Sequence, residues 1–340
     1  MRRIGLTLGD PCGIGPELWV KTLLPLRATP HELSRLTMYG DEEVLARTAA
    51  QLGVAREWQS AREQLTVEPI TKLTAREVLP GQPNQISGIS QLSYLSAAIA
   101  DASAGRIYGL VTGPIHKASA KAAGLAFPGH TELLAAHLLA PERTVVMMLA
   151  GPSLRVALCT IHIALSAVPA ALSVNGIRDT LVTTALALHE DFAEATPYLS
   201  VLGLNPHAGE SGHFGDEESR LIIPAIEEAR RSPILQSLSG LHMSGPQVPD
   251  VAFRHALYPP KGQSRPSAVI AMYHDQGLIP IKLLDFDHTV NVTLGLRVVR
   301  TSPDHGTAHD IAGLGIARPD SLQAALRMCL CHTDQRAAKP

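Results

Sequence analysis

The strongest constraint on this chain is the alternation of two kinds of segment along its length. Short apolar runs rich in Val, Ile and Leu are followed by longer stretches rich in Ala, Leu and Glu. The short runs have the length of buried strands, whereas the longer stretches repeat their apolar residues with the period of a helix. This order of strand, helix and strand is typical of sheets covered by helices on both faces. The sequence therefore predicts an α/β fold.

The individual elements follow from the same periodicities. Strands are predicted at residues 3–8, 36–40, 108–112, 144–149, 155–161, 199–204, 267–273 and 290–294. Helices are predicted at residues 16–26, 41–53, 87–104, 131–140, 169–190, 215–231 and 319–331. Two stretches are predicted to be surface connections: residues 54–86, which lack clear periodicity, and the Pro- and Gly-rich segment 259–266.

Charge, hydropathy and cysteine content exclude several classes of protein. The 29 Lys and Arg residues nearly balance the 31 Asp and Glu residues, so neither nucleic acid nor an anionic membrane is an expected partner. No apolar run approaches the roughly 20 residues that span a bilayer, and the first residues lack a signal-peptide pattern. We therefore expect a cytoplasmic protein. The four cysteines are too few and too unevenly spaced for a disulfide framework, and the run Cys329–His332 has the wrong spacing for a zinc knuckle, so we expect packed or unreactive thiols.

Three histidines come just after the carboxyl ends of predicted strands: His162, His207 and His274. In open parallel sheets ligands bind at that edge, so three imidazoles can converge there although they are far apart in the sequence. Three His ligands with one open position form a catalytic zinc site, in which the open position polarises a substrate oxygen. The alternative is that each histidine is an ordinary loop residue.

The segment 127–134 is a candidate anion site. Thr131 is predicted to cap a helix, with His130 just outside it. Free N–H groups and the positive end of the helix dipole attract phosphate or carboxylate at such a position. Any helix capped by Ser or Thr fits that description, so an ordinary capped helix is the alternative.

Two further segments have the composition of ligand-facing loops. Gly9–Glu17 joins the first strand to the first helix, but Leu18 stands where a G-x-G-x-x-G dinucleotide motif needs its third glycine. A Rossmann motif is therefore not supported, and the segment is either a tight turn or a ligand-facing loop. Between residues 290 and 319, polar residues and glycines are packed densely between apolar stretches, as in a binding loop.

These motifs together resemble one known family. Residues 305–317 resemble the adenosine-binding loop of the isocitrate and isopropylmalate dehydrogenases. Further motifs of the resemblance lie, in order, at residues 9–17, 112–117, 128–132, 205–210, 271–277 and 291–296. The chain is similar, from about residue 4 to residue 328, to the 4-hydroxythreonine-4-phosphate dehydrogenase family of pyridoxal phosphate biosynthesis.

The resemblance implies an isopropylmalate-dehydrogenase-like fold of two α/β/α domains with the active site in the cleft between them. The first domain would consist of residues 1–125 and 297–340, and the second, residues 126–296, would carry the metal ligands and the dimer contacts. The resemblance also implies a homodimer in which the partner subunit completes each active site.

The resemblance further assigns ligands and site residues. It implies a divalent metal, zinc before magnesium, manganese or cobalt, with ligands that do not all come from one subunit: His162, His207 and His274. The substrate contacts that it implies are His130, Thr131, Lys282, Asn291 and Arg300. NAD or NADP would lie along residues 305–317, with contacts from His305, Gly306, Thr307, Ala308 and Asp310. Either Asp275 or Lys282 would take the proton.

The implied reaction is a metal-assisted oxidation of a small phosphorylated substrate. 4-Phosphohydroxy-L-threonine would lose a hydride from C3 to NAD or NADP. The product, 2-amino-3-oxo-4-phosphooxybutanoate, is a β-keto acid that decarboxylates to 3-amino-2-oxopropyl phosphate.

The chain departs from the family pattern at a few positions. Arg297 stands where Pro is common, Pro303 precedes Asp304, and Ile163–Ala164 stand where Leu-Pro is usual. Arg297 adds a cation near Arg300, a predicted substrate contact. The resemblance therefore does not fix which substrate the protein oxidises.

Paralogues oxidise 4-phosphoerythronate or 4-phosphothreonate, and another branch oxidises cis-dihydrodiols. The presence of His130 and Thr131 favours a phosphorylated substrate over a dihydrodiol. Outside the dehydrogenases, the alternatives are an acyltransferase related to phosphotransacetylases and a non-catalytic protein that binds a phosphorylated metabolite.

Overall fold

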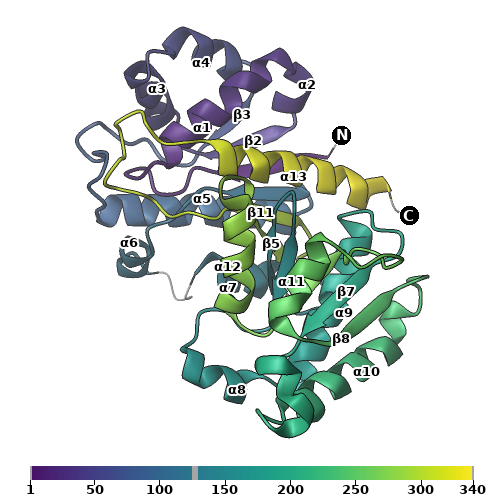
Figure 1. Cartoon of the computed structure of the whole chain (residues 1–340). Helices are drawn as coiled ribbons and strands as arrows, with labels where there is room; N and C mark the ends of the chain where they lie inside the picture. The colour runs from purple at the N-terminus through teal and green to yellow at the C-terminus, as the bar shows by residue number, and fades with distance from the viewer. Residues whose placement is uncertain (1, 125–128, 339–340) are drawn as a thin grey trace. The chain divides into compact units, whose positions relative to one another are not determined.

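The computed structural model describes residues 2–124 and 129–338, and the chain divides into two compact units (Figure 1). The first unit comprises the chain up to Leu138 together with Arg297–Ala337. The second unit comprises Leu139–Leu296. Helix α7 (His130–Leu138), which the sequence division placed in the second domain, belongs to the first unit.

The first unit is built on a parallel sheet with the strand order β3-β2-β1-β4-β11. Its strands are β1 (Ile4–Thr7), β2 (Leu36–Gly40), β3 (Thr66–Pro69), β4 (Gly109–Thr112) and β11 (Val299–Pro303). Four of them are buried along their whole length, because helices cover both faces of the sheet. Strand β3 lies at the edge and leaves Glu68 and Pro69 exposed.

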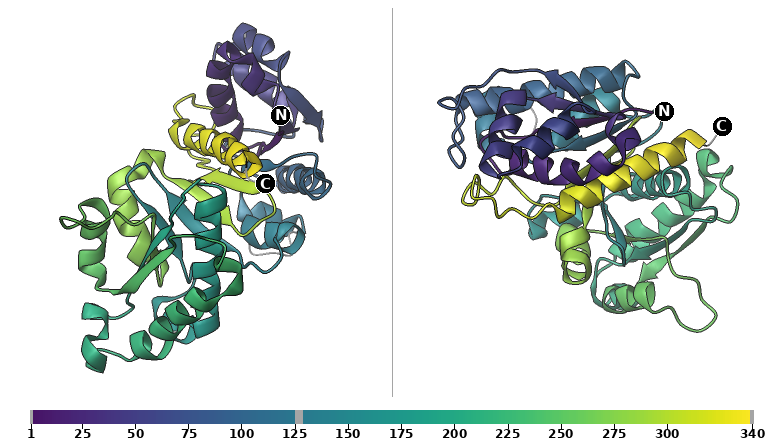
Figure 2. Two further views of the ribbon diagram at one scale, coloured as in Figure 1. Left: turned by 90° about the vertical axis from the view of Figure 1, so that its right-hand side faces the viewer. Right: turned by 90° about the horizontal axis from the view of Figure 1, so that it is seen from above.

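Helices lie on both sides of this sheet. They are α1 (Gly15–Leu23), α2 (Pro30–Leu33), α3 (Glu42–Gln51), α4 (Ala55–Arg62), α5 (Gln85–Ser103), α6 (Lys117–Ala122), α7 and α13 (Asp320–Ala338), with the 3₁₀ turn η1 (Leu24–Ala28). Helix α5 contacts β1, β2 and β4 and lies on the opposite side from α1 and α13 (Figure 2). Polar caps start several of these helices: the Asp41 carboxylate accepts the Val44 N–H, and Asn84 forms a capping box with Ser87.

The direction in which strands are added to this sheet reverses at β1. The chain adds β2 and β3 on one side of β1 and then returns to place β4 on the other side. Such a reversal opens a crevice at the carboxyl ends of the two central strands. Gly9 follows β1 with φ of 78°, and a Cβ there would lie 2.4 Å from the Pro114 carbonyl oxygen. Only glycine permits this close approach of the loops after β1 and β4.

The second unit is built on a mixed sheet with the strand order β10-β5-β6-β9-β7-β8. Its strands are β5 (Val146–Ala150), β6 (Arg155–Leu158), β7 (Tyr198–Leu202), β8 (His242–Gln247), β9 (Ala268–Ala271) and β10 (Val290–Leu294). Strand β5 is antiparallel to both of its neighbours, whereas β6, β9, β7 and β8 are parallel. The carboxyl ends of these last four strands therefore share one edge of the sheet.

Helices and short turns cover the second sheet. They are α8 (Val168–Ala171), α9 (Val174–Glu190), α10 (Ile223–Arg231), α11 (Pro249–Leu257) and α12 (His274–Asp285), with the turns η2 (Leu165–Ala167), η3 (Pro206–Gly212), η4 (Glu218–Ile222), η5 (Pro233–Leu235) and η6 (Phe286–His288). Helix α12 contacts β6 and β9, and α11 contacts β7. Alternate residues of a strand point to the same face of the sheet. Val156 and Leu158 of β6 and Val269 and Ala271 of β9 belong to the hydrophobic core of this unit.

The predicted strands are all present within a few residues, but several elements were not predicted. These are β3, β8 and β11, and the helices α2, α4, α6, α11 and α12. The prediction of a connection over residues 54–86 is wrong, because α4 and β3 lie there. The helix predicted at 169–190 is interrupted after α8 by the extended residue Leu172. The segment 259–266 contains neither helix nor strand, as predicted.

The described cysteines are free thiols, as expected. Burial raises the pKa of Cys12 to about 11 and that of Cys329 to about 12, so both stay protonated as packed side chains. Within residues 2–124 and 129–338, no helix combines the length and the apolar character needed to cross a membrane.

Candidate functional site

The three histidines follow three neighbouring parallel strands of the second unit. Strand β9 pairs with β6 on one side and with β7 on the other. His162 follows β6, His207 lies in η3 after β7, and His274 is the first residue of α12 after β9. The sheet therefore delivers all three residues to one edge, as the sequence predicted.

Two of the three imidazoles lie side by side. The ring centroids of His162 and His274 are 5.5 Å apart. The Nδ1 atom of His274 lies 2.7 Å from a carboxylate oxygen of Asp275. A carboxylate only accepts hydrogen bonds, so Nδ1 carries the proton and the lone pair of Nε2 is left for a metal ion.

The third histidine lies in an unusual stretch of backbone. His207 and the four residues after it all have positive φ values, and the side chain of His207 is 67% exposed. Its Nδ1 atom lies 3.4 Å from a carboxylate oxygen of Glu210, and its ring contacts Phe214 edge-on. His207 thus resembles His274 in having a carboxylate beside Nδ1.

The donor set fits a divalent metal such as zinc, because imidazoles are zinc ligands and the carboxylate of Asp275 at Nδ1 of His274 leaves Nε2 of that ring as the ligand atom. Among the residues that the structure describes, however, no three His, Cys, Asp or Glu side chains lie close enough together to hold an ion. The structure brings together His162 and His274, and the position of His207 at the same edge is set by β7.

A buried carboxylate holds the loop that carries His207. Glu218 is 4% exposed and lies in the π-helical turn η4. One of its carboxylate oxygens accepts the backbone N–H groups of Leu204 and Asn205, each at 2.8 Å, and the other accepts the Asn205 side-chain amide at 3.0 Å. Glu218 therefore fixes the exit of β7. The sequence analysis missed it, because an acidic residue at the start of a helix is also what the helix dipole favours.

The other predicted residues of the second unit are spread along two elements. Asp275 and Lys282 both lie on α12, about two turns apart, and Asn291 is a half-buried residue of β10 paired with Leu149 of β5. The Asp275 carboxylate forms a hydrogen bond with the His274 ring. Lys282 is half-buried.

The predicted substrate residues of the first unit lie on α7 and β11. Helix α7 begins at His130, so the prediction that Thr131 is the cap and His130 lies outside the helix is wrong by one residue. The Leu133 N–H bonds to the Gly129 carbonyl oxygen, which makes Gly129 the residue before the helix. Thr131 is half-buried in the first turn, and the side chain of His130 lies outside the described part of the structure.

Arg300 is a buried residue of β11. One guanidinium nitrogen donates to the Thr112 hydroxyl at 2.6 Å. Burial lowers the pKa of Arg300 to about 10, which still leaves it charged at neutral pH. A cation held in the interior, here near the start of β11, is suited to an anionic ligand.

Residues 305–317 form a loop that follows β11 and precedes α13. Thr307 is buried, and its carbonyl oxygen accepts the Ile14 N–H at 2.9 Å. His305, Gly306 and Asp310 are exposed, and Ala308 is half-buried with φ of 39°. A Cβ on Gly13 would lie 2.9 Å from the Thr307 carbonyl oxygen, so the glycine-rich turn before α1 makes room for this loop.

A contact between a carboxylate and a histidine that the sequence analysis missed joins the same two segments. Asp10 is fully buried, and one of its carboxylate oxygens lies 3.0 Å from Nε2 of His309. The ring of His309 meets the ring of His116 edge-on at 4.9 Å. Asp10 and His309 are so far apart in the sequence that no local pattern could have paired them.

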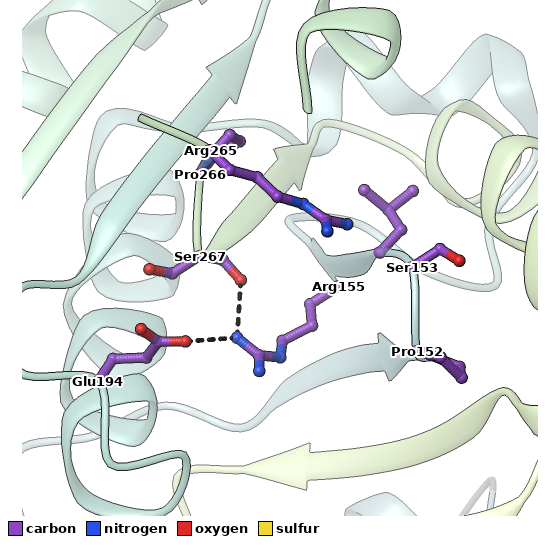
Figure 3. Close-up of a pocket in the computed structure, with 9 residues that line it drawn as sticks. Pro152, Ser153, Arg155, Glu194, Arg265, Pro266 and Ser267 are labelled. Carbon is purple, nitrogen blue, oxygen red and sulfur yellow. Dashed lines mark hydrogen bonds and ion pairs between the residues drawn. The ribbon is translucent and has the colours of Figure 1, made fainter. Parts of the chain in front are cut away.

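The second unit contains a cavity of about 260 Å³ (Figure 3). Its lining residues precede β6 and β9 or begin them, so it lies at the opposite edge of the sheet from the histidines, which follow the carboxyl ends of the strands. It is lined by residues at the starts of β6 and β9, including Arg155 and Ser267. Arg155 donates to Glu194 at 2.7 Å and to the Ser267 carbonyl oxygen at 3.3 Å, so its charge is compensated within the protein. None of the predicted site residues lines this cavity.

Comparison with known proteins decides the family. A family model described as "Pyridoxal phosphate biosynthetic protein PdxA" matches residues 32–329. The chain belongs to the PdxA family. A 4-hydroxythreonine-4-phosphate dehydrogenase of Desulfosudis oleivorans is 44% identical to this PdxA-family chain over 335 residues, which are 96% of this chain and 95% of the relative.

Solved structures agree with this assignment. The 4-hydroxythreonine-4-phosphate dehydrogenase of Klebsiella pneumoniae superposes with a TM-score of 0.81 at 32% identity, covering 98% of this chain and all of the other. A terephthalate 1,2-cis-dihydrodiol dehydrogenase of Burkholderia xenovorans gives a TM-score of 0.65 at 28% identity, with 98% of each chain covered. The predicted isopropylmalate-dehydrogenase-like fold class and the predicted family are confirmed.

The anchoring role of Glu218 predicts a stability difference between two neighbouring carboxylates. Glu218→Gln replaces one acceptor oxygen by an NH₂ group that faces the Asn205 amide, so we expect the free energy of unfolding to fall by about 1–3 kcal/mol in urea titrations. Glu217 contacts only the Asn205 side chain among these groups, and Glu217→Gln should cost less than about 1 kcal/mol. Equal losses in the two variants would contradict the anchoring role.

Proposed function

We propose that this PdxA-family protein is a cytoplasmic oxidoreductase that uses NAD or NADP to oxidise 4-phosphohydroxy-L-threonine at C3. The product, 2-amino-3-oxo-4-phosphooxybutanoate, then decarboxylates to 3-amino-2-oxopropyl phosphate. The observation that carries the proposal is the likeness, over nearly the whole chain, to relatives named 4-hydroxythreonine-4-phosphate dehydrogenase. The second unit would supply the metal ligands and the dimer contacts.

His162, His207 and His274 are the proposed metal ligands. Their positions at the ends of three adjacent strands and the carboxylates beside two of them support this assignment. A divalent ion bound there would act as a Lewis acid that lowers the pKa of the substrate alcohol. Asp275 would orient His274 through Nδ1, which leaves Lys282 as the better candidate for the residue that takes the proton.

The remaining predicted residues would bind the substrate and the cofactor. Thr131 and His130 lie in the first turn of α7, where free N–H groups favour the phosphate. Asn291 and the buried cation of Arg300 would contact the polar part of the substrate. The nicotinamide cofactor would lie on the loop that carries its five predicted contact residues: His305, Gly306, Thr307, Ala308 and Asp310.

The proposed homodimer is supported by exposed apolar side chains on the segments that carry two of the proposed metal ligands, His162 and His274. Leu283 is 84% exposed and Phe286 72% exposed, at the end of the helix that begins with His274. Leu165, which follows His162 by three residues, is 68% exposed. A second copy of the chain would cover these side chains and surround the ligands with protein.

A substrate panel tests the activity directly. With NAD or NADP, we expect 4-phosphohydroxythreonine to give the highest kcat/KM, measured by absorbance of the reduced nicotinamide. The panel includes 4-phosphoerythronate, 4-phosphothreonate and a terephthalate cis-dihydrodiol, which represent the paralogues. A higher kcat/KM for any of these, or no turnover at all, would overturn the proposed substrate.

Elemental analysis tests the metal site. We expect about one divalent ion per chain in the purified protein and its loss in His207→Ala. Because neutral imidazoles bind the ion, affinity should fall as the pH drops below about 6.5. His213→Ala, which removes a neighbouring exposed histidine, is the matched control and should keep the ion. An unchanged metal content in His207→Ala would contradict the assignment of His207 as a metal ligand.

Sedimentation tests the dimer. We expect the wild type to sediment as a dimer and Leu283→Asp to shift it to the monomer, because a buried unpaired carboxylate is costly at an interface. Tyr258→Asp, at a side chain that is 74% exposed elsewhere in the second unit, should leave the dimer intact. A wild type that is active as a monomer would refute the dimer.

A further inference from the structure

The loop 305–317 has little structure of its own to hold its shape. It contains no helix or strand, and a few internal bonds close its turns, such as the Leu314 N–H to the Ile311 carbonyl oxygen at 3.2 Å. Gly313 and Gly315 have φ values of 78° and 75°, which glycine adopts without strain. A loop of this kind keeps one conformation only if other elements bind its backbone.

Helix α1 binds the end of the loop through one pair of opposite charges. Glu17 is 3% exposed, and its carboxylate accepts the N–H groups of Ala317 at 2.8 Å and Gly315 at 3.2 Å. Lys21, one turn further along α1, donates to the carbonyl oxygens of the same two residues, each at 2.8 Å. The two side chains also contact each other at 2.7 Å. Glu17 and Lys21 thus bind both the donors and the acceptors of Gly315 and Ala317.

The start of the loop is held separately. His309 pairs with the buried Asp10, and the Ile14 N–H donates to the Thr307 carbonyl oxygen. Leu314 and Ile316, beside the anchored residues Gly315 and Ala317, have side chains that are 63% and 61% exposed. The loop is therefore fixed at both ends while some of its side chains face solvent.

We propose that Glu17 and Lys21 are positioning residues that hold the loop 305–317 in the conformation that binds the nicotinamide cofactor. The inference rests on the proposed function, which places the cofactor on this loop. A loop that is already ordered loses less conformational freedom when the ligand binds, so fastening it strengthens cofactor binding. The pair touches neither reacting atoms nor metal ligands, so its loss should raise the KM for the cofactor more than it lowers kcat.

Substitution of Lys21 tests this directly in the full-length, metal-loaded protein. Lys21→Met keeps the aliphatic stem but removes two bonds to the loop, and we expect a roughly tenfold or larger rise in the Kd for NAD or NADP by calorimetry. The amides of Gly315 and Ala317 should exchange hydrogen faster, while metal content stays unchanged. Lys21→Arg, which can still donate to the carbonyl oxygens, should restore most of the affinity.

Arg318→Met is the matched control. It removes an exposed cation beside the loop that forms an ion pair with Asp320 at 3.3 Å, so the Kd should change by less than about twofold. If Lys21→Met does not fold, the double variant Glu17→Gln/Lys21→Met removes the buried unpaired charge and gives the same comparison.

The outcomes separate the two proposals. Unchanged cofactor affinity in Lys21→Met, or unchanged exchange of the loop amides, would overturn the positioning role while leaving the proposed function intact. If the wild type binds neither NAD nor NADP, the proposed function itself fails.

Discussion

Buried carboxylates that accept backbone N–H groups are the interaction on which the loops of this protein depend. Parallel strands end at one edge of a sheet, where the chain leaves the ladder and its N–H groups need new acceptors. Asp10, Glu17 and Glu218 are each at most 4% exposed, and each accepts at least one backbone N–H from a loop: one for Asp10 and two each for Glu17 and Glu218. Several N–H donors offset the cost of removing a carboxylate from water.

Buried carboxylates bind different loops in the two units. In the first unit, Asp10 and Glu17 tie the glycine-rich turn and α1 to the loop 305–317, beside β1, where the strand order reverses. In the second unit, Glu218 fixes the chain that leaves β7 toward His207. Buried carboxylates therefore hold both the candidate cofactor loop and the chain segment that leads to one candidate metal ligand.

The parts of the fold predicted from sequence are those whose signal is local. Strands β5 and β9 are continuous apolar runs. The predicted strands β6, β7 and β9 lead to the three histidines. Strand β11 was missed because Arg300 and Thr301 look like loop residues, yet they are buried by bonds to Thr112 and to the Ala325 carbonyl oxygen. Helix α12 was missed because it contains Gly277 and Pro280.

Tertiary contacts explain why α12 contains a glycine and was therefore not predicted. A Cβ on Gly277 would lie 2.6 Å from the Val156 side chain, so the glycine that weakens the helix signal is what lets α12 pack closely on β6. In the candidate site too, contacts between distant parts of the chain could not be predicted from the sequence. The three histidines could be placed from strand order, whereas the partners Asp10 with His309 and Glu17 with Gly315 join distant parts of the chain.

The most direct test of the central claim is a crystal structure of the protein soaked with zinc and NAD, with anomalous scattering measured at the zinc edge. We predict one anomalous peak within coordination distance of the imidazoles of His162, His207 and His274, counting both subunits of a dimer, with nucleotide density along residues 305–317. A zinc peak away from these imidazoles, or a nucleotide bound elsewhere, would contradict it.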